Sequence, residues 1–159
     1  MSGRIEARLA ELGIHLPSPM APIANYVPWV VTGNLAVISG QVPAIDGKVS
    51  VTGQVGAEPT ADVTEREAKD AARLCLINVL VHLKAACGGD LDRVRRVVRL
   101  GGYIASAPGF TGQAQVMNGA SDLAVEVFGE AGRHARTTIG VPVLPADAAV
   151  EVEGMFEIG

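Results

Sequence analysis

The sequence predicts an α+β fold in which one mixed β-sheet carries two helices on one of its faces. Two segments have the apolar spacing of long helices, and a β-branched segment lies between them. Pairs of strand-like segments precede the first helix and follow the second. Short turns favour antiparallel neighbours and strand–helix–strand connections favour crossovers, so both kinds of pairing are expected. In chain order the segments are 27–31, 35–39, 64–87, 94–104, 111–128, 132–143 and 148–159.

A short amphipathic helix is predicted before the first strand. Its apolar positions, spaced as in a helix and surrounded by charged residues, are Ile5, Leu9 and Leu12. We interpret residues 1–19 as an N-terminal helical extension that caps the domain, and residues 20–159 as the domain itself. The proline-rich stretch 20–28 is expected to be irregular.

Turn residues divide the first part of the domain into short strands. Thr32-Gly33-Asn34 separates the first two strands and is typical of a hairpin turn. Asp46-Gly47 marks a second tight turn, and a short edge segment is expected at 49–51.

The first long helix has a clear start and a clear end. Thr64 and Glu67 have the form of a capping box, and Gly88-Gly89 stops the apolar pattern. Its inward stripe is predicted to consist of Ala68, Ala72, Leu76, Val79, Leu80 and Leu83. The second long helix is ended by Gly129.

The two final strands are expected to form a hairpin around Leu144-Pro145-Ala146-Asp147. In the second strand apolar residues alternate with polar ones, which is typical of a strand with one buried face. The first strand carries a single cation, Arg136, which needs an anion from the protein or from a ligand because burying it unpaired is costly. Glu151 is a candidate. A register shift of one residue decides whether the two side chains share a face, and the sequence leaves both outcomes open.

Composition limits the class of protein. The chain has 159 residues, 48% of them hydrophobic and only 4% aromatic, with a net charge of −4. This length predicts one domain, and the apolar excess predicts burial of the uncovered sheet face against other subunits. The acidic balance argues against nucleic acid as the main partner, and Arg93, Arg95, Arg96 and Arg99 are expected to form a solvated or salt-bridged strand face.

The expected location is cytoplasmic. The chain has no apolar run of the ~20 residues that cross a bilayer, and charged residues interrupt its N-terminus where an apolar signal segment would lie. Cys75 and Cys87 lie on one predicted helix and are expected to be reduced packing residues. The sequence contains no cysteine or histidine cluster at metal-ligand spacing, no P-loop and no nucleophile elbow.

Several motifs resemble those of a known family. Ala135-Arg136-Thr137-Thr138-Ile139-Gly140-Val141, Leu144-Pro145 and Val150-Glu151-Val152-Glu153 form one group, near the C-terminus. Ile38-Ser39-Gly40-Gln41-Val42-Pro43 is an earlier motif, with Asn25-Tyr26 before it. Together they closely resemble the signatures of the YjgF/RidA family, also labelled endoribonuclease L-PSP, over nearly the whole chain from about residue 20.

The resemblance implies a chorismate mutase-like domain that forms a homotrimer, with the sheets packed into a central barrel and clefts between subunits. It implies an enamine/imine deaminase that hydrolyses 2-aminoacrylate-type intermediates to a 2-keto acid and ammonia, with neither metal nor organic cofactor. The partner implied is a small carboxylate-bearing metabolite, without membrane or nucleic acid.

Catalytic roles carried over from the family fall on two residues. Arg136 matches the arginine that grips the substrate carboxylate, and a guanidinium can do this bidentately. Glu151 matches the acidic residue that helps to position water. The substrate-binding positions implied by the same resemblance are Tyr26, Gly40, Phe110, Asn118 and Thr137.

The sequence also departs from the family pattern. The gap from Asn118 to Gly129 is longer than usual, Thr137-Thr138 replaces a common Ser followed by Cys or Ala, and the N-terminal helix is an addition. These features resemble a divergent, longer subgroup. Two other functions stay open: a non-catalytic regulatory protein that binds a small carboxylate, and an endoribonuclease or translation inhibitor, which the acidic balance and the scarcity of aromatic residues disfavour.

Overall fold

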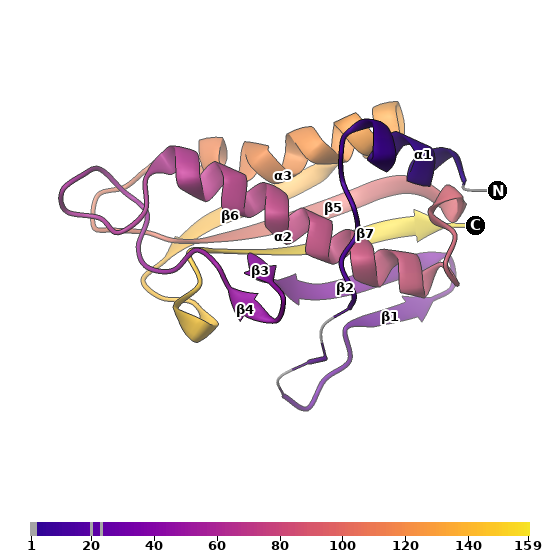
Figure 1. Cartoon of the computed structure of the whole chain (residues 1–159), viewed down its shortest axis with the longest axis horizontal. Coiled ribbons are helices and arrows are strands. Elements are labelled where there is room, and N and C mark those ends of the chain that lie inside the picture. Colours follow the sequence, from indigo (N-terminus) through magenta and orange to yellow (C-terminus); the bar gives the residue numbers. More distant parts are fainter. Residues whose placement is uncertain (1–2, 20, 23) are drawn as a thin grey trace.

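The computed structural model describes residues 3–19, 21–22 and 24–159, and it confirms the α+β class (Figure 1). Residues 20 and 23, which belong to the stretch predicted to be irregular, lie outside the described residues. The helices are α1 (Arg4–Glu11), α2 (Glu65–Ala86) and α3 (Gln113–Phe128). The strands are β1 (Trp29–Thr32), β2 (Leu35–Gln41), β3 (Ala44–Ile45), β4 (Lys48–Val49), β5 (Val94–Ala105), β6 (Ala135–Val141) and β7 (Val150–Ile158).

The main sheet has five strands in the order β1-β2-β7-β5-β6. The pairing of β5 with β6 is parallel, and the other pairings are antiparallel. The helices α2 and α3 lie side by side on one face, and the opposite face is uncovered (Figure 1). We call these the helix face and the open face. No helix in the described part of the chain is both long and apolar enough to cross a membrane.

The capping box predicted for α2 is confirmed. The Thr64 hydroxyl accepts a hydrogen bond from the Glu67 N–H at 3.2 Å, and the Glu67 carboxylate accepts one from the Thr64 N–H at 2.8 Å. All six residues of the predicted inward stripe are buried. Cys75 and Cys87 are buried and free, as expected of packing residues.

The predicted hairpin of the two last strands is wrong. β6 and β7 are not neighbours, because β5 lies between them and pairs with both. The physical reason lies in the two connections. β5–α3–β6 is a strand–helix–strand crossover, which makes neighbouring strands parallel. The turn at Pro145–Asp147 is a 3₁₀ turn, after which the chain enters the sheet at its centre. Because β6 and β7 do not pair, no hairpin register decides whether Arg136 and Glu151 share a face.

The Asp46-Gly47 turn is confirmed. It connects β3 and β4, a small separate hairpin, and both residues have positive φ angles of 49° and 80°. Such a turn suits aspartate followed by glycine. The predicted edge segment 49–51 is represented only by its first residue, at the end of β4.

The helix α1 is held on the core by a carboxylate from a distant segment. Its N-cap is Gly3, which offers no side-chain acceptor. Instead the Asp92 carboxylate accepts hydrogen bonds from the N–H groups of Arg4 and Ile5, each at 2.8 Å. Below it, Ile5 and Leu9 are buried in the main core. Asp92 thus performs the capping role that the helix lacks.

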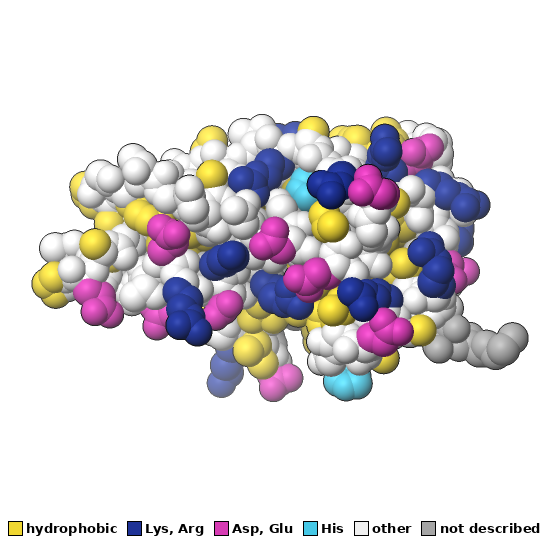
Figure 2. Space-filling model, turned by 90° about the horizontal axis from the view of Figure 1, so that it is seen from above, with side chains coloured by type: hydrophobic (Ala, Val, Ile, Leu, Met, Phe, Trp, Pro, Cys, Tyr) yellow, Lys and Arg dark blue, Asp and Glu magenta, His cyan; other side chains and the backbone are white. Residues whose placement is uncertain are grey.

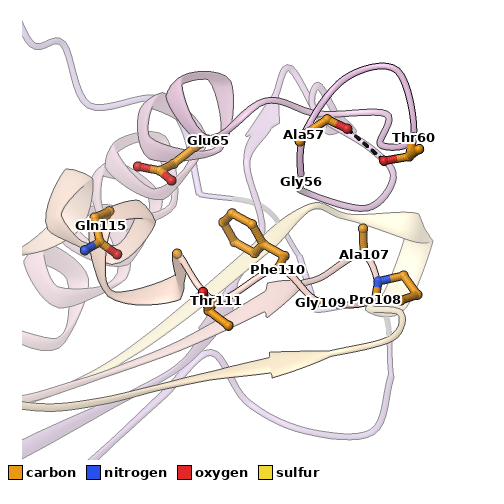
Figure 3. Close-up of a pocket in the computed structure, with 11 residues that line it drawn as sticks. Gly56, Ala57, Thr60, Glu65, Ala107, Pro108, Gly109, Phe110, Thr111 and Gln115 are labelled. Atoms are coloured by element: carbon orange, nitrogen blue, oxygen red, sulfur yellow. Dashed lines mark hydrogen bonds between the residues drawn. The ribbon is translucent and has the colours of Figure 1, made fainter.

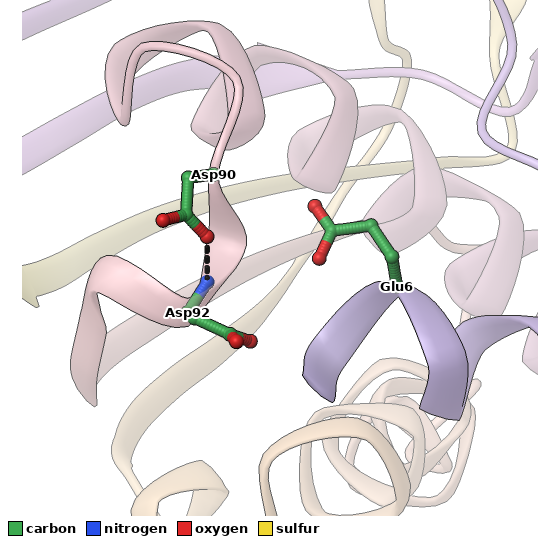
Figure 4. Close-up of side chains that lie close together, drawn as sticks. All are labelled: Glu6, Asp90 and Asp92. Atoms are coloured by element: carbon green, nitrogen blue, oxygen red, sulfur yellow. Dashed lines mark hydrogen bonds between the residues drawn. The ribbon is translucent and has the colours of Figure 1, made fainter. Parts of the chain in front are cut away.

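Glu6 and Asp90 lie beside Asp92, and their carboxylate oxygens come within 4.8 Å of one another (Figure 4). Each is engaged within the protein: Glu6 pairs with the Lys84 ammonium at 3.4 Å, and Asp90 accepts from the Asp92 N–H at 2.9 Å. The contacts of these three carboxylates therefore hold α1 against the loop between α2 and β5.

We expect Asp92→Ala to loosen α1. The backbone N–H groups of Arg4 and Ile5 lower the pKa of Asp92 below its ordinary value of 3.8. A carboxyl whose pKa is lowered by folding stabilises the fold above its ordinary pKa and loses that effect as the pH falls through the lowered value. Thermal unfolding should thus separate wild type from Asp92→Ala at neutral pH, and the two curves should converge in acid. The exposed Asp70→Ala is the control, and a difference that persists in strong acid would contradict this explanation.

Candidate functional site

The Arg136 side chain lies on the helix face and reaches α3. Its Nη1 donates to the Asn118 amide oxygen at 2.9 Å and to the Ser121 hydroxyl at 3.1 Å, and its Nη2 donates to the Ala114 carbonyl at 3.1 Å. All three acceptors are neutral oxygens. The guanidinium is therefore oriented by α3, while its charge is not balanced by these contacts.

Ser121 is itself held in place. The His134 ring bonds to the Gly132 carbonyl through Nδ1 at 2.6 Å and to the Ser121 hydroxyl through Nε2 at 2.9 Å. If Nδ1 carries the proton, as a carbonyl partner requires, Nε2 accepts from Ser121, whose oxygen is left to accept from Arg136. Sequence reasoning missed Ser121 and His134, because only the fold brings them to Arg136.

Two of the five N–H groups of Arg136 have no acceptor in the described part of the chain, one on Nε and one on Nη2. These nitrogens lie along one edge of the guanidinium, the edge that a carboxylate can bind with both oxygens. No carboxylate of the described residues lies within ion-pair distance of Arg136. The half-buried Arg136 is thus arranged as an anchor for an external anion.

The second predicted catalytic residue, Glu151, lies in a different place. It is on β7, aligned with Tyr103 of β5, whereas Arg136 is aligned with Leu100 of that strand. Leu100 is buried under the helices, and Tyr103, three residues on, belongs to the open face. Arg136 and Glu151 therefore lie on opposite faces of the sheet with β5 between them, and a single chain does not bring them together.

Glu151 lines a cleft of about 460 Å³ at the point where β2 ends. Tyr26 and Gly40, two of the predicted substrate-binding residues, line the same cleft. Its other walls come from the β3–β4 hairpin, the turn at Pro145–Asp147 and α2. The cleft thus contains three of the predicted site residues, and Arg136 with Asn118 forms a separate pair.

The Glu151 carboxylate rests directly on Gly40. A Cβ atom at position 40 would lie 2.2 Å from Oε1 of Glu151, closer than any real contact, so only glycine leaves room for this carboxylate. Glu151 is half-buried, and burial raises its pKa above the ordinary value of 4.5, with the nearby charge of Glu153 adding to the effect. A carboxyl group in this state can exchange protons closer to neutral pH.

Phe110 and Thr137 lie with neither group. Phe110 precedes α3 and lines an open hollow formed mainly by the loops at 56–60 and 107–112 (Figure 3). Thr137 follows Arg136 on β6 and so points to the open face, where it is exposed next to Gly101 of β5. The structure therefore does not bring these two predicted residues to either part of the site.

Seen from above in the orientation of Figure 1, where α1 and α3 lie, the molecule shows Lys and Arg side chains intermixed with Asp and Glu (Figure 2). On the open face Val30, Val37 and Ile139 are 51%, 38% and 45% exposed, across strands far apart in the sequence. Of the arginines of β5, Arg99 pairs with Glu153 at 3.3 Å.

We expect Gly40→Ala to displace the Glu151 carboxylate without unfolding the protein, because the atom that the new methyl group meets is the end of a flexible side chain. The pKa of Glu151, followed by NMR, should fall towards 4.5 as the carboxyl leaves its half-buried position. Gly101→Ala is the matched control, since its methyl group would meet Glu153 at 2.6 Å instead. Gly101→Ala should change the pKa of Glu151 less than Gly40→Ala does, because burial raises this pKa more than the charge of Glu153 does. Equal pKa shifts in the two variants would contradict the placement of the Glu151 carboxylate on Gly40.

Comparisons with known proteins agree with this architecture. Residues 6–157 match the family described as "YjgF/chorismate mutase-like, putative endoribonuclease". Protein TCP17 of Trypanosoma cruzi is 51% identical over 158 residues, which cover 99% of this chain and 96% of that protein. The crystal structure of Atu1372 from Agrobacterium tumefaciens is 48% identical, with a TM-score of 0.89 over 98% of this chain and 92% of the other.

A third similar protein is the one in a crystal structure from Shewanella oneidensis MR-1, which is described as a "putative endoribonuclease". It is 36% identical, with a TM-score of 0.92 over 98% of this chain and 100% of the other. The family match spans nearly the whole sequence and includes the strands that carry Gly40, Arg136 and Glu151. The chain therefore belongs to the YjgF/chorismate mutase-like family, as its motifs predict.

Proposed function

We propose that this protein is an enamine/imine deaminase, which hydrolyses 2-aminoacrylate-type intermediates to a 2-keto acid and ammonia without a cofactor. The observation that carries the proposal is the state of Arg136. Three neutral oxygens orient its guanidinium, and two N–H groups, one on Nε and one on Nη2, have no acceptor among the described residues and can bind a carboxylate. A 2-imino acid presents that carboxylate next to the carbon that water must attack.

Glu151 supplies the proton chemistry in this proposal. Its carboxylate takes a proton from water as the water oxygen bonds to the protonated imine carbon, which gives a carbinolamine. The protonated carboxyl then donates to the amine nitrogen, the C–N bond breaks and ammonia leaves. The hydroxyl passes its proton to the regenerated Glu151 carboxylate as the keto group forms, and Glu151 then releases that proton to solvent. The raised pKa of Glu151 suits both directions of transfer.

The proposed site is shared between subunits. Arg136 and Glu151 lie on opposite faces of one sheet, so a second copy has to supply one of them. The exposed apolar side chains of the open face support association through that face, since patches of this kind mark protein interfaces. We propose a homotrimer in which Arg136 of one subunit faces the Glu151 cleft of its neighbour.

We expect Arg136→Ala to lower kcat/KM at least about 100-fold, because loss of the anchor forfeits both substrate affinity and orientation. The assay measures ammonia released from imines that an amino-acid oxidase generates in situ. Arg133→Ala is the control, since Arg133 is largely exposed and, in the part of the chain that the structure describes, forms an ion pair only with Glu130 of its own loop. Carboxylate binding without turnover by the wild type would favour the regulatory binding protein, and RNA cleavage would favour the endoribonuclease.

The same variant tests whether the site is shared. Arg136→Ala and Glu151→Gln homo-oligomers should each be nearly inactive. Mixed oligomers, made by unfolding and refolding the two variants together, should regain part of the activity, because some interfaces then combine an intact Arg136 with an intact Glu151. Absence of any recovery, or a monomer in light scattering, would exclude the shared site.

The pH profile reports on Glu151. Its carboxylate must be ionised to accept a proton from water, so kcat/KM should fall as the pH drops through the raised pKa, at a higher pH than for an exposed carboxyl. Glu153→Gln should move this acid limb to lower pH, because Glu153 contributes to the shift. In Glu151→Gln the residual activity should lack the limb; an unchanged limb in that variant would assign it to another group.

A further inference from the structure

The buried face of α2 carries a histidine that the proposed reaction does not use. His82 is 4% exposed and lies one helical turn after Asn78, on the same side of the helix. The Asn78 amide donates to the carbonyls of Val42 and Ala44 at 3.0 and 3.2 Å. This side of α2 is thereby fixed against the segment that follows β2, which is the wall of the Glu151 cleft.

His82 reaches that cleft. Its side chain lines the cavity of about 460 Å³ together with Glu151, and it also lines a small hollow beside Gln41. No hydrogen bond links either ring nitrogen to another residue in the described ranges 3–19, 21–22 and 24–159. Because the ring lines the cavity, it can donate to or accept from a group on a bound molecule.

The charge state of the ring follows from its surroundings. Burial lowers the pKa of His82, which keeps the imidazole neutral at pH 7, with one N–H donor and one acceptor nitrogen. The other ionisable groups lining the cavity are Glu151, Tyr26 and Lys48, and Lys48 is exposed. A neutral imidazole beside a carboxylate favours a neutral hydrogen-bonding group over an anion.

The remaining walls are largely apolar, with Pro28, Val42, Val49 and Pro145 among them. The cavity has more room than a three-carbon acid fills. A substrate whose reacting carbon lies at Glu151 can therefore extend a side chain along apolar walls towards α2. His82 is the polar group on that side, contributed by a different element from the residues of the reaction.

We propose that His82 is a specificity-determining residue that hydrogen-bonds the end of the substrate side chain. The substrates that fit best are imines of amino acids whose side chains end in a neutral hydrogen-bonding group, such as an amide or a hydroxyl. This assignment rests on the proposed function, because it uses the same cleft and the same orientation of the imine. It deepens that function by naming the class of side chain that the cleft selects.

Three imines of nearly the same shape test the proposal: those derived from asparagine, leucine and aspartate. The kcat/KM for ammonia release should be about tenfold higher for the asparagine imine than for the leucine imine, as expected of one hydrogen bond between neutral groups. In His82→Leu this ratio should fall to about one, and His82→Gln, which keeps a donor and an acceptor, should recover part of it. His15→Leu, the same change at an exposed histidine, should leave the ratio as in wild type.

A second readout separates this proposal from the proposed function. The Kd values of the corresponding 2-oxo acids, measured by calorimetry, should show the same preference and the same loss in His82→Leu. If no imine is turned over but the binding preference depends on His82, the deaminase proposal fails and the role of His82 stands. Three results would overturn the role of His82. They are equal affinities for the amide and aliphatic acids, a preference for the aspartate-derived acid, and a preference for the amide acid that survives His82→Leu in a folded protein.

Discussion

The position of β7 at the centre of the sheet determines how the rest of the chain is arranged. Its inward residues, Val150, Val152, Phe156 and Ile158, are all buried under the helices. The period of two then forces Glu151 and Glu153 onto the open face. β2 pairs with one edge of this strand and β5 with the other, so β6 cannot pair with β7 and lies outside β5. The separation of Arg136 from Glu151 follows from this order of strands.

Local signals predicted most of the elements. The capping box at Thr64, the Asp46-Gly47 turn and the apolar stripe of α2 depend on residues close in sequence, and the structure confirms each of them. The pairing of the last two strands is a non-local choice. Two strand-like segments joined by a short turn resemble a hairpin, and no local signal reveals that β5 lies between them. The argument that hairpin register decides whether Arg136 and Glu151 share a face assumed that their strands pair, and it was wrong for that reason.

The sequence likewise predicted some residues of the candidate site and missed others. Motifs identified Arg136, Glu151, Tyr26, Gly40 and Asn118, and the structure places these five residues in two groups. Ser121 and His134 could not be predicted as supports of Arg136, because a serine on a helix and a histidine before a strand carry no pattern. Asp92 likewise caps a helix 87 residues away from it in sequence. Such contacts depend on where the folded chain brings distant segments.

The separation of the Arg136 anchor from the cleft has an evolutionary consequence. The contacts of Arg136 come from α3, whereas the walls of the cleft come from β2, the β3–β4 hairpin, α2 and the turn before β7. Substitutions in parts that share no contacts have nearly additive effects. A duplicated gene could therefore drift at positions such as 42, 49 and 82 and acquire a new ligand preference, while the recognition of the carboxylate is inherited unchanged.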